Sequence, residues 1–402
     1  MAVVNYAKQY AQALSQAYAN VLHFGALFAR KQEGDYRWSN NNTVEVPSIS
    51  VTGRFDGSRD TINAKQRRHS NKYTPLTLRN HRVWDDLIHP RDISETNQVL
   101  SIQNITRTMN ETEKFPEKDK YLISTLYSDW CATGRVGFSA VLTKDNVLPY
   151  FDKMMETQTE RNIPAAGRIL YITTEVDTLL KNAVAFYRIA GDMSASIQRA
   201  LSYVDKVQIE VVPSDHMLTA YDFTIGAVKG DTAKQISMFL VHPSAVITPE
   251  SYDFAQLDPP SAGTDGKYVY FEESFEDCFI LPNKQYGLDF VVNDLSVSTA
   301  TFTTAASAED DAVAGDAKVT MTAPVGTNVL TGSRYFYATK ASTAVAVPGY
   351  GEYVTKVSDF KEFALADVIN GTNANKITIV VSDIEGRVYA GGSADLTSKA
   401  AG

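Results

Sequence analysis

Residues 42–51 read NTVEVPSISV, and residues 54–82 follow with eight lysines and arginines but only two acids. The valines and the isoleucine of the first segment alternate loosely with polar residues, which predicts a strand. The basic segment has few apolar side chains, and an isolated two-stranded hairpin is only marginally stable in water. We therefore interpret residues 34–92 as an extended polar arm that needs a surface from another part of the chain or from another chain.

The 402-residue chain is 44% hydrophobic and 21% charged, a composition typical of folded globular proteins. This length predicts two or three domains. The net charge of −9 argues against a dedicated nucleic-acid binder, which would carry a basic field. It allows a protein that encloses nucleic acid without gripping it.

Cys131 and Cys278 are far apart in the sequence, in contexts that indicate two free core thiols in a reducing cytoplasm. The N-terminus has no basic start followed by an apolar run, so we expect no signal peptide. No stretch approaches the roughly 18 apolar residues of a membrane span, so we expect a soluble protein without a membrane partner.

Apolar residues at helical spacing predict several helices. The first, over residues 5–31, either packs on its own core or docks on a partner. Ser94 is a predicted N-cap, and Pro116 suits the first turn of the next helix. A third helix, over residues 144–161, is expected to be interrupted by Pro149.

Residues 168–290 have the pattern of a mixed α/β region. A helix is expected to begin at Thr174 with that residue as its cap. The run 237–242 is almost continuously apolar, which predicts a strand covered on both faces. The other predicted strands are 168–172, 207–213, 268–271 and 288–292.

The composition changes near residue 295, where Ala, Thr, Val, Ser and Gly dominate. Short strands alternate with turn residues, which predicts a small β-sandwich of about a hundred residues. Its linker is expected at residues 296–307. The predicted strands are 318–322, 333–337, 376–381 and 387–389.

The sequence lacks the common phosphate-loop, dinucleotide, zinc-protease and serine-hydrolase motifs. Its six histidines are not spaced as metal ligands on one element. The carboxylates of residues 272–277 are interpreted as a solvated loop rather than an acid–base pair. Asp85 and Asp86 either offset the basic arm of a neighbouring subunit or lie in an exposed turn. We expect no catalytic residue, no metal, no cofactor and no enzymatic activity.

The basic segment suits either phosphate contacts or contacts between subunits. Only Phe55 and Tyr73 are available for base stacking, which disfavours single-strand binding. A basic arm on an acidic chain is self-complementary, and such matching sets orientation between partners. The predicted inter-subunit residues are therefore Arg54, Arg59, Lys65, Arg67, Arg68, Lys72, Arg79 and Arg82.

Residues 160–181 read ERNIPAAGRILYITTEVDTLLK, and residues 277–287 read DCFILPNKQYG. With residues 211–214, 239–247 and the entry segment 34–46, they resemble the major capsid proteins of tailed bacteriophages, which have the Hong Kong 97-type fold. The resemblance covers about residues 1–292.

The resemblance implies an α+β fold with an N-terminal arm (1–33), an extended loop (34–92), and a peripheral domain with a spine helix (93–165). An axial domain with returning peripheral strands would follow (166–292). Residues 293–402 resemble the Ig-like domains that some phage capsid proteins append.

The resemblance also implies a structural virion protein that self-assembles into pentamers and hexamers of an icosahedral shell around double-stranded DNA, without sequence-specific binding. Assembly would occur in the host bacterial cytoplasm, with a portal and a separate scaffolding protein as partners. Some family members form a covalent bond between a loop lysine and an asparagine of a neighbour. Lys65 and Lys72 lie in the loop, but no acceptor is identified, so non-covalent assembly is expected.

Two alternatives stay open. One is the shell of a bacterial nanocompartment (encapsulin-like) that encloses an enzyme. The other is a surface or tail-associated protein that binds glycan through its C-terminal domain. Aromatic residues available for the glycan also suit a sandwich core; they are Tyr335, Phe336, Tyr337, Tyr350 and Tyr353.

Overall fold

The computed structural model divides into two compact units along a chain that crosses between them several times. The first unit falls within residues 1–122, 222–228 and 243–285, and the second within 123–221, 229–242 and 286–402. The residues that the structure describes are 20–28, 36–40, 42–54, 56, 67–95, 102–189, 203–204, 207–306, 316–322, 329–341, 343–357, 359–364, 368–370 and 375–395.

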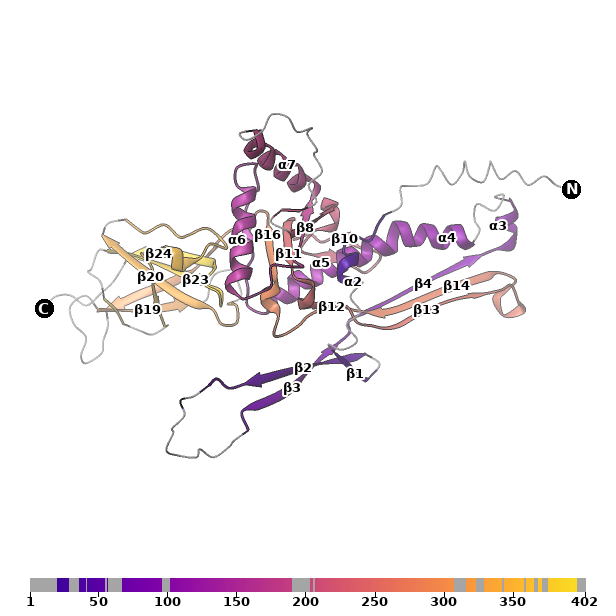
Figure 1. Cartoon of the computed structure of the whole chain (residues 1–402), viewed down its shortest axis with the longest axis horizontal. Coiled ribbons are helices and arrows are strands. Elements are labelled where there is room, and N and C mark those ends of the chain that lie inside the picture. Colours follow the sequence, from indigo (N-terminus) through magenta and orange to yellow (C-terminus); the bar gives the residue numbers. More distant parts are fainter. Residues whose placement is uncertain are drawn as a thin grey trace. The chain divides into compact units, whose positions relative to one another are not determined.

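A long hairpin sheet projects from the first unit (Figure 1). Its strands are antiparallel in the order β1-β2-β3, with bounds Arg37–Asn40, Thr43–Val51 and His69–Thr77. Val44 and Val46 of β2 are buried, whereas Ile49 and Val51 are exposed. The predicted strand is therefore confirmed, and only the half of the hairpin nearest its root has a core to pack against.

The root of the hairpin packs on a short strand pair. Val44, Val46 and Leu78 form one buried cluster with residues of β12 (Val246–Ile247), β15 (Phe279–Ile280) and Leu281. The hairpin root is therefore held by apolar contacts inside the first unit.

A second antiparallel sheet has the order β13-β14-β4, with bounds Glu250–Asp258, Tyr268–Glu276 and Asn80–Ile88. Its long ribbons lie beside the helical segment labelled α4 (Figure 1). Strand β4 contains Asp85 and Asp86, so the alternative of an exposed turn is wrong for this pair. The segment predicted as one arm thus contains two structures, a hairpin and a strand that pairs with β14.

The helices near this sheet differ in part from the predicted ones. Residues 20–24 are not helical, and the rest of the predicted helix 5–31 lies outside the described residues apart from α2 (Gly25–Phe28). Ser94 lies inside α3 (Pro90–Glu95) rather than before a helix. Pro116 is the second residue of α5 (Phe115–Ala132), but it does not lie in the first turn of a separate helix, because helical residues 102–114 precede it without a break. A π-helical segment, Asn110–Lys114, joins α5 to α4 (Ile102–Met109).

The second unit is built on a six-stranded mixed sheet in the order β5-β16-β11-β6-β8-β7. All side chains of the central strands β6, β11 and β16 are buried, which confirms the prediction from the continuous apolar run. The bounds are Phe138–Ser139 (β5), Leu288–Val292 (β16), Ile236–Val241 (β11), Ile169–Thr173 (β6), Val207–Val212 (β8) and Tyr203–Val204 (β7).

Helices α6 (Val147–Glu160) and α7 (Thr174–Ile189) contribute to the main core of this unit. Pro149 does not interrupt α6, because it lies in the first turn, where its missing N–H has no partner to lose. The cap of α7 is Thr173 rather than Thr174: its Oγ1 accepts the N–H of Val176 at 3.5 Å.

The C-terminal part of the second unit contains two β-sheets (Figure 1). Residues 298–306 are strands rather than the predicted linker, and Ala300 and Phe302 are buried. One sheet has the order β17-β24-β23-β20-β21, with bounds Ser298–Thr299, Val388–Asp395, Asn375–Ser382, Arg334–Ala341 and Lys361–Phe363; the other is β18-β19-β22, with bounds Thr301–Ala306, Asp316–Thr322 and Val368–Asn370. Side chains from both sheets share one apolar core.

Short elements complete the described chain. They are the strand pair β9 (Tyr221–Asp222) and β10 (Val228–Lys229), and the 3₁₀ turns Ser214–His216, Pro243–Ala245, Ala262–Thr264, Gln285–Gly287 and Val354–Lys356.

A buried ion cluster, which we call the Arg387 clasp, joins the C-terminal sheets to the six-stranded sheet. The Arg387 side chain is 1% exposed and binds Asp289 of β16 through two contacts of 2.9 and 3.0 Å. It also donates to the carbonyl of Val136 and lies 4.2 Å from the ring of Phe138. A buried bidentate pair of this kind needs full hydrogen bonding to offset the desolvation of two charges.

Asp383 extends the clasp. Its carboxylate accepts the backbone N–H groups of Val136, Glu385 and Arg387 at 2.8–3.0 Å. Burial raises the pKa of Asp383 to about 6, and the nearby Arg387 guanidinium opposes that rise. Gly351, at φ +78°, approaches the Gly137 carbonyl so closely that a Cβ would lie 2.5 Å from it. The two parts of this unit are therefore in direct backbone contact.

We expect Arg387→Met to destabilise the second unit by about 3–5 kcal/mol, because it leaves Asp289 buried without its partner. The free energy of opening is measured from hydrogen exchange of the β23 and β24 amides. Arg334→Met is the matched control, since the Arg334–Glu362 pair joins β20 to β21 near the surface, with side chains 35% and 50% exposed, and its loss should cost no more than about 1 kcal/mol. Equal effects of the two variants would contradict the role of the clasp.

Candidate functional site

The eight predicted inter-subunit cations fall into three groups. Arg59 and Lys65 lie outside the described residues. Arg79 and Arg82 follow β3 and bind carboxylates of their own chain. The remaining four are exposed on the outer half of the hairpin, and they are Arg54, Arg67, Arg68 and Lys72. The structure thus separates cations at the hairpin root from cations toward its tip.

The root cation Arg79 is bound by Asp277, whose side chain is fully buried. Asp277 accepts the Arg79 backbone N–H at 2.8 Å and its Nε at 3.0 Å. It also accepts the Tyr121 hydroxyl at 3.0 Å and the Cys278 N–H at 2.7 Å. One carboxylate, directly after β14, therefore links the hairpin root to helix α5 and also accepts the N–H of the next residue, Cys278. Burial, reinforced by the charge of Asp277, raises the pKa of Tyr121 and keeps its hydroxyl a donor.

A row of ion pairs joins the helical segment to β14 and β4. Lys114 binds Glu272, and Lys118 binds Glu276 at 2.7 Å. Arg82 of β4 binds Glu117 at 2.5 Å and donates to the Phe223 carbonyl at 2.7 Å. The prediction that residues 272–277 form a solvated loop is therefore wrong, because they lie on or next to a strand and are ion-paired.

The hydroxyl of Tyr270 reinforces this row by donating to Glu272 at 3.0 Å. Burial, with the hydrogen bond to Glu272, raises the pKa of Tyr270 to about 12. Ion pairs with partly shielded members are stronger than fully exposed ones, and Glu272 is only 9% exposed. These carboxylates are arranged to hold the sheet on the helix.

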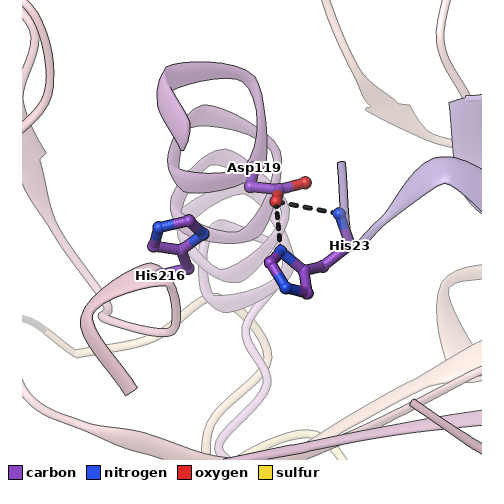
Figure 2. Close-up of side chains that lie close together, drawn as sticks. All are labelled: His23, Asp119 and His216. Carbon is purple, nitrogen blue, oxygen red and sulfur yellow. Dashed lines mark hydrogen bonds and ion pairs between the residues drawn. The ribbon is translucent and has the colours of Figure 1, made fainter. Parts of the chain in front are cut away.

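The N-terminal segment is fastened to α5 by a single buried acid. Asp119 accepts the backbone N–H of His23 at 3.0 Å and contacts His23 Nδ1 at 3.0 Å (Figure 2). It also accepts the backbone N–H of Phe24 at 3.1 Å. Phe24 is itself fully buried. Before His23, the Asn20 N–H donates to the Glu111 carbonyl in the π-helical segment. The Phe115 N–H donates to the Asn110 carbonyl rather than to that of Glu111, which leaves the Glu111 carbonyl available.

The outer half of the hairpin presents both apolar and basic groups to solvent. Ile49 and Val51 are 74% and 75% exposed. The backbone there is held by the strand ladder and by side-chain contacts such as Ser50 to Ser70 at 2.7 Å. At the root, Arg37 pairs with Glu45 at 2.7 Å and lies 3.9 Å from the Tyr73 ring. The outer half of the hairpin is therefore an ordered, exposed surface that does not pack on the core of the first unit.

Sequence reasoning missed the row of ion pairs. The available signal was the matching spacing of opposite charges, with Lys114 and Lys118 four residues apart in a predicted helix and Glu272 and Glu276 four apart near a predicted strand. The paired residues are separated by 158 positions in the sequence, so only the fold shows that they meet.

Comparisons with known proteins identify the class of fold. No protein-family model matches the chain, and no curated protein sequence matches it. Among solved structures, the chain matches a phage capsid structure, and it is a mixed α+β protein with the fold of that structure.

The structure "Capsid structure of the Cyanophage P-SCSP1u" matches with a TM-score of 0.50 and 12% sequence identity, over 69% of this chain and 90% of that chain. A chain from Mycobacterium phage Che8 has a TM-score of 0.47 and 14% identity, over 69% of this chain and 93% of its own. The "Asymmetric unit of bacteriophage PhiM1 mature capsid" has a TM-score of 0.48 and 12% identity, over 63% and 82%. In the part of the chain that the structure describes, no helix has the length and apolarity needed to cross a membrane.

We expect Asp277→Ala to destabilise the hairpin root by about 2–4 kcal/mol, because the backbone N–H groups of Arg79 and Cys278 lose a buried acceptor. Hydrogen exchange of the amides at residues 76–80 should accelerate accordingly. Glu273→Ala is the matched control: its partner His81 is 53% exposed, so removing the pair should change exchange by less than about 1 kcal/mol. Unchanged exchange in the Asp277 variant would refute the anchoring role.

Proposed function

We propose that this protein is the structural subunit of an icosahedral phage capsid, which self-assembles into pentamers and hexamers and encloses double-stranded DNA. The observation that carries this proposal is the hairpin: its root is fixed inside the first unit while its outer half is exposed. The similarity to the cyanophage capsid structure supports the same function.

The geometry of the hairpin suits a contact between copies. A rigid root lets the outer half keep a defined direction, so ordering it on a neighbour costs little conformational entropy. The exposed cations of the hairpin have a charge opposite to that of the rest of the chain, which is net acidic. Electrostatic complementarity then orients one copy on the next. Many modest interfaces, each of about 1,000 Å² or more, would sum to a stable shell.

We assign the parts of the chain to the Hong Kong 97-type plan. Residues 1–33 are the N-terminal arm, and the extended loop begins at residue 34. The peripheral domain contains the helical segment α4 to α5 as spine helix, with β4, β13 and β14 as its long sheet. The axial domain contains the six-stranded sheet, and residues 293–402 form an Ig-like domain.

The assembly we propose is non-covalent and uses a separate scaffolding protein and a portal in the host cytoplasm. The cations near the tip would contact neighbouring copies, whereas DNA is enclosed without base-specific contacts. Arg79 and Arg82 serve this assembly indirectly, because their pairs with Asp277 and Glu117 fix the hairpin root and β4.

The aromatic residues considered for glycan binding are engaged in the second unit. Phe336 is 4% exposed, and Tyr335 and Tyr337 pack on the apolar core around Phe363. Tyr353 binds the Arg387 Nε at 3.1 Å, and Tyr350 packs on the cluster around Val136. These contacts favour a core role over ligand recognition.

Deleting residues 54–72 is expected to leave a soluble, folded subunit that forms no shells. The deletion joins Gly53 to Tyr73 and keeps the register in which Val44 pairs with Leu76 and Pro47 with Tyr73, so the buried root is retained. Particles are counted by negative-stain electron microscopy, and folding is checked by circular dichroism.

A second variant replaces residues 54–72 by a neutral Gly–Ser segment of equal length. This variant keeps the length of the hairpin segment but removes its charges and its strand residues. It too should fail to form shells. Shells of normal size from the deletion variant would show that the hairpin is not the assembly element. The content of wild-type particles, DNA or a protein cargo, separates a capsid from a nanocompartment.

A further inference from the structure

The Arg387 clasp, taken with the ion pair next to it, contains more buried acids than buried bases. Its arginines are Arg135 and Arg387, and its acids are Asp289, Asp383 and Glu385. At most 5% of any of these five side chains is exposed. With all five groups ionised, the cluster carries one net negative charge in the interior of the second unit, and a buried net charge is costly.

Each arginine of the cluster is paired with one acid. Arg387 binds Asp289 through two contacts, and Arg135 binds Glu385 at 3.1 Å. Glu385 also lies 3.8 Å from the Arg387 guanidinium, which connects the two pairs. Among the described residues, Asp383 is the acid of the cluster that has no ion pair, and its carboxylate accepts backbone N–H groups instead. The unbalanced negative charge therefore belongs to Asp383.

Asp383 lies at the boundary between the two parts of the second unit. It is in the turn that joins β23 to β24, and its Oδ2 accepts the N–H of Val136 at 3.0 Å. Val136 lies two residues before β5, which belongs to the six-stranded sheet. Separating the C-terminal sheets from that sheet would therefore break this bond and bring Asp383 into contact with water.

Charged and titratable side chains surround Asp383 from every element packed on the turn. Burial raises the pKa of the nearby Tyr350 hydroxyl, which therefore stays uncharged. The side chains on the other elements are Asp289 of β16, Arg135 before β5, Arg334 of β20, Glu385 and Arg387 of the turn and β24 side, and Tyr353, whose hydroxyl lies 3.1 Å from Arg387 Nε.

Burial has the largest effect on Asp383 and raises its pKa from 3.8 to about 6, whereas Arg387 and the backbone donors oppose this rise. An acid whose pKa is higher in the closed contact than in water binds its proton more tightly when the contact is closed. The contribution of this group to the contact is therefore complete below about pH 4 and is lost as the pH rises through about 6.

We propose that Asp383 is a proton-binding latch, which holds the C-terminal sheets more tightly on the six-stranded sheet as the surroundings become acidic. Uptake of one proton neutralises the cluster while both ion pairs keep their charges, so the contact gains stability without losing a partner. The proposal concerns the second unit alone and does not depend on the proposed capsid function.

The test is hydrogen exchange of the full-length chain, followed at residues 134–138 and divided by the intrinsic exchange rate at each pH. Opening of the contact is expected to become about tenfold rarer between about pH 7.5 and about pH 5, because the closed contact binds the proton with a pKa of about 6. Asp383→Asn cannot take up this proton, so its opening should change by less than about twofold over the same range.

Glu362→Gln is the matched control. Glu362 is an exposed carboxylate of the same five-stranded sheet, and its hydrogen bond with Arg334 lowers its pKa, so it titrates below the tested range. This variant should keep the tenfold response of the wild type.

Glu385→Gln tests the charge balance independently. Removing this acid makes the ionised cluster neutral and lowers the affinity of Asp383 for its proton, so the response should fall below about threefold. Circular dichroism at about pH 7.5 checks that each variant is folded. A wild-type contact that opens equally often at both pH values overturns the proposal, as does a tenfold response that persists in Asp383→Asn. If Asp383→Asn does not fold, a full tenfold response in Glu385→Gln overturns it.

Discussion

The buried carboxylate of Asp277 is the interaction on which the first unit depends most. It binds the hairpin root through Arg79, helix α5 through Tyr121, and the backbone directly after β14. A charged group with no exposed surface is stable only when its hydrogen bonds are complete, so the three elements are fixed together or not at all. The direction in which the hairpin leaves the unit is set here, far in sequence from the exposed cations that the hairpin carries.

Charge in the first unit is organised by depth. Near the helix, carboxylates and amines are paired side by side, as Lys118 with Glu276 and Arg82 with Glu117. Farther from the helix, positive and negative charges lie on separate surfaces, with cations on the outer half of the hairpin and acids on β13. Paired charges that are partly shielded fix geometry, whereas segregated exposed charges attract a partner of opposite sign.

The parts of this fold that the sequence predicts well are those whose signal is local. Strand β11 is predicted from one apolar run and α5 from its apolar periodicity, because burial on both faces and helical spacing are each visible within a few residues. The ion pairs of β14 were missed because their partners lie in a helical segment 158 residues away in the sequence. Residues 298–306 have the small polar composition of a linker, yet strand pairing with β24 and β19 makes them part of a sheet. The sequence grouped Arg79 and Arg82 with the other cations of the basic segment, because their carboxylate partners, Asp277 and Glu117, are distant in the sequence.

The Arg387 clasp has a consequence for the C-terminal sheets. A domain attached by a flexible linker samples many orientations, whereas these sheets share buried charges with the six-stranded sheet. Opening the contact would leave Arg387 and Asp289 without each other, and an unpaired charge that stays buried costs far more free energy than an exposed one. The attachment is therefore cooperative, and the backbone approach at Gly351 leaves no space for a side chain between the two parts. The surface of the C-terminal sheets is therefore held in an orientation that the rest of the second unit sets.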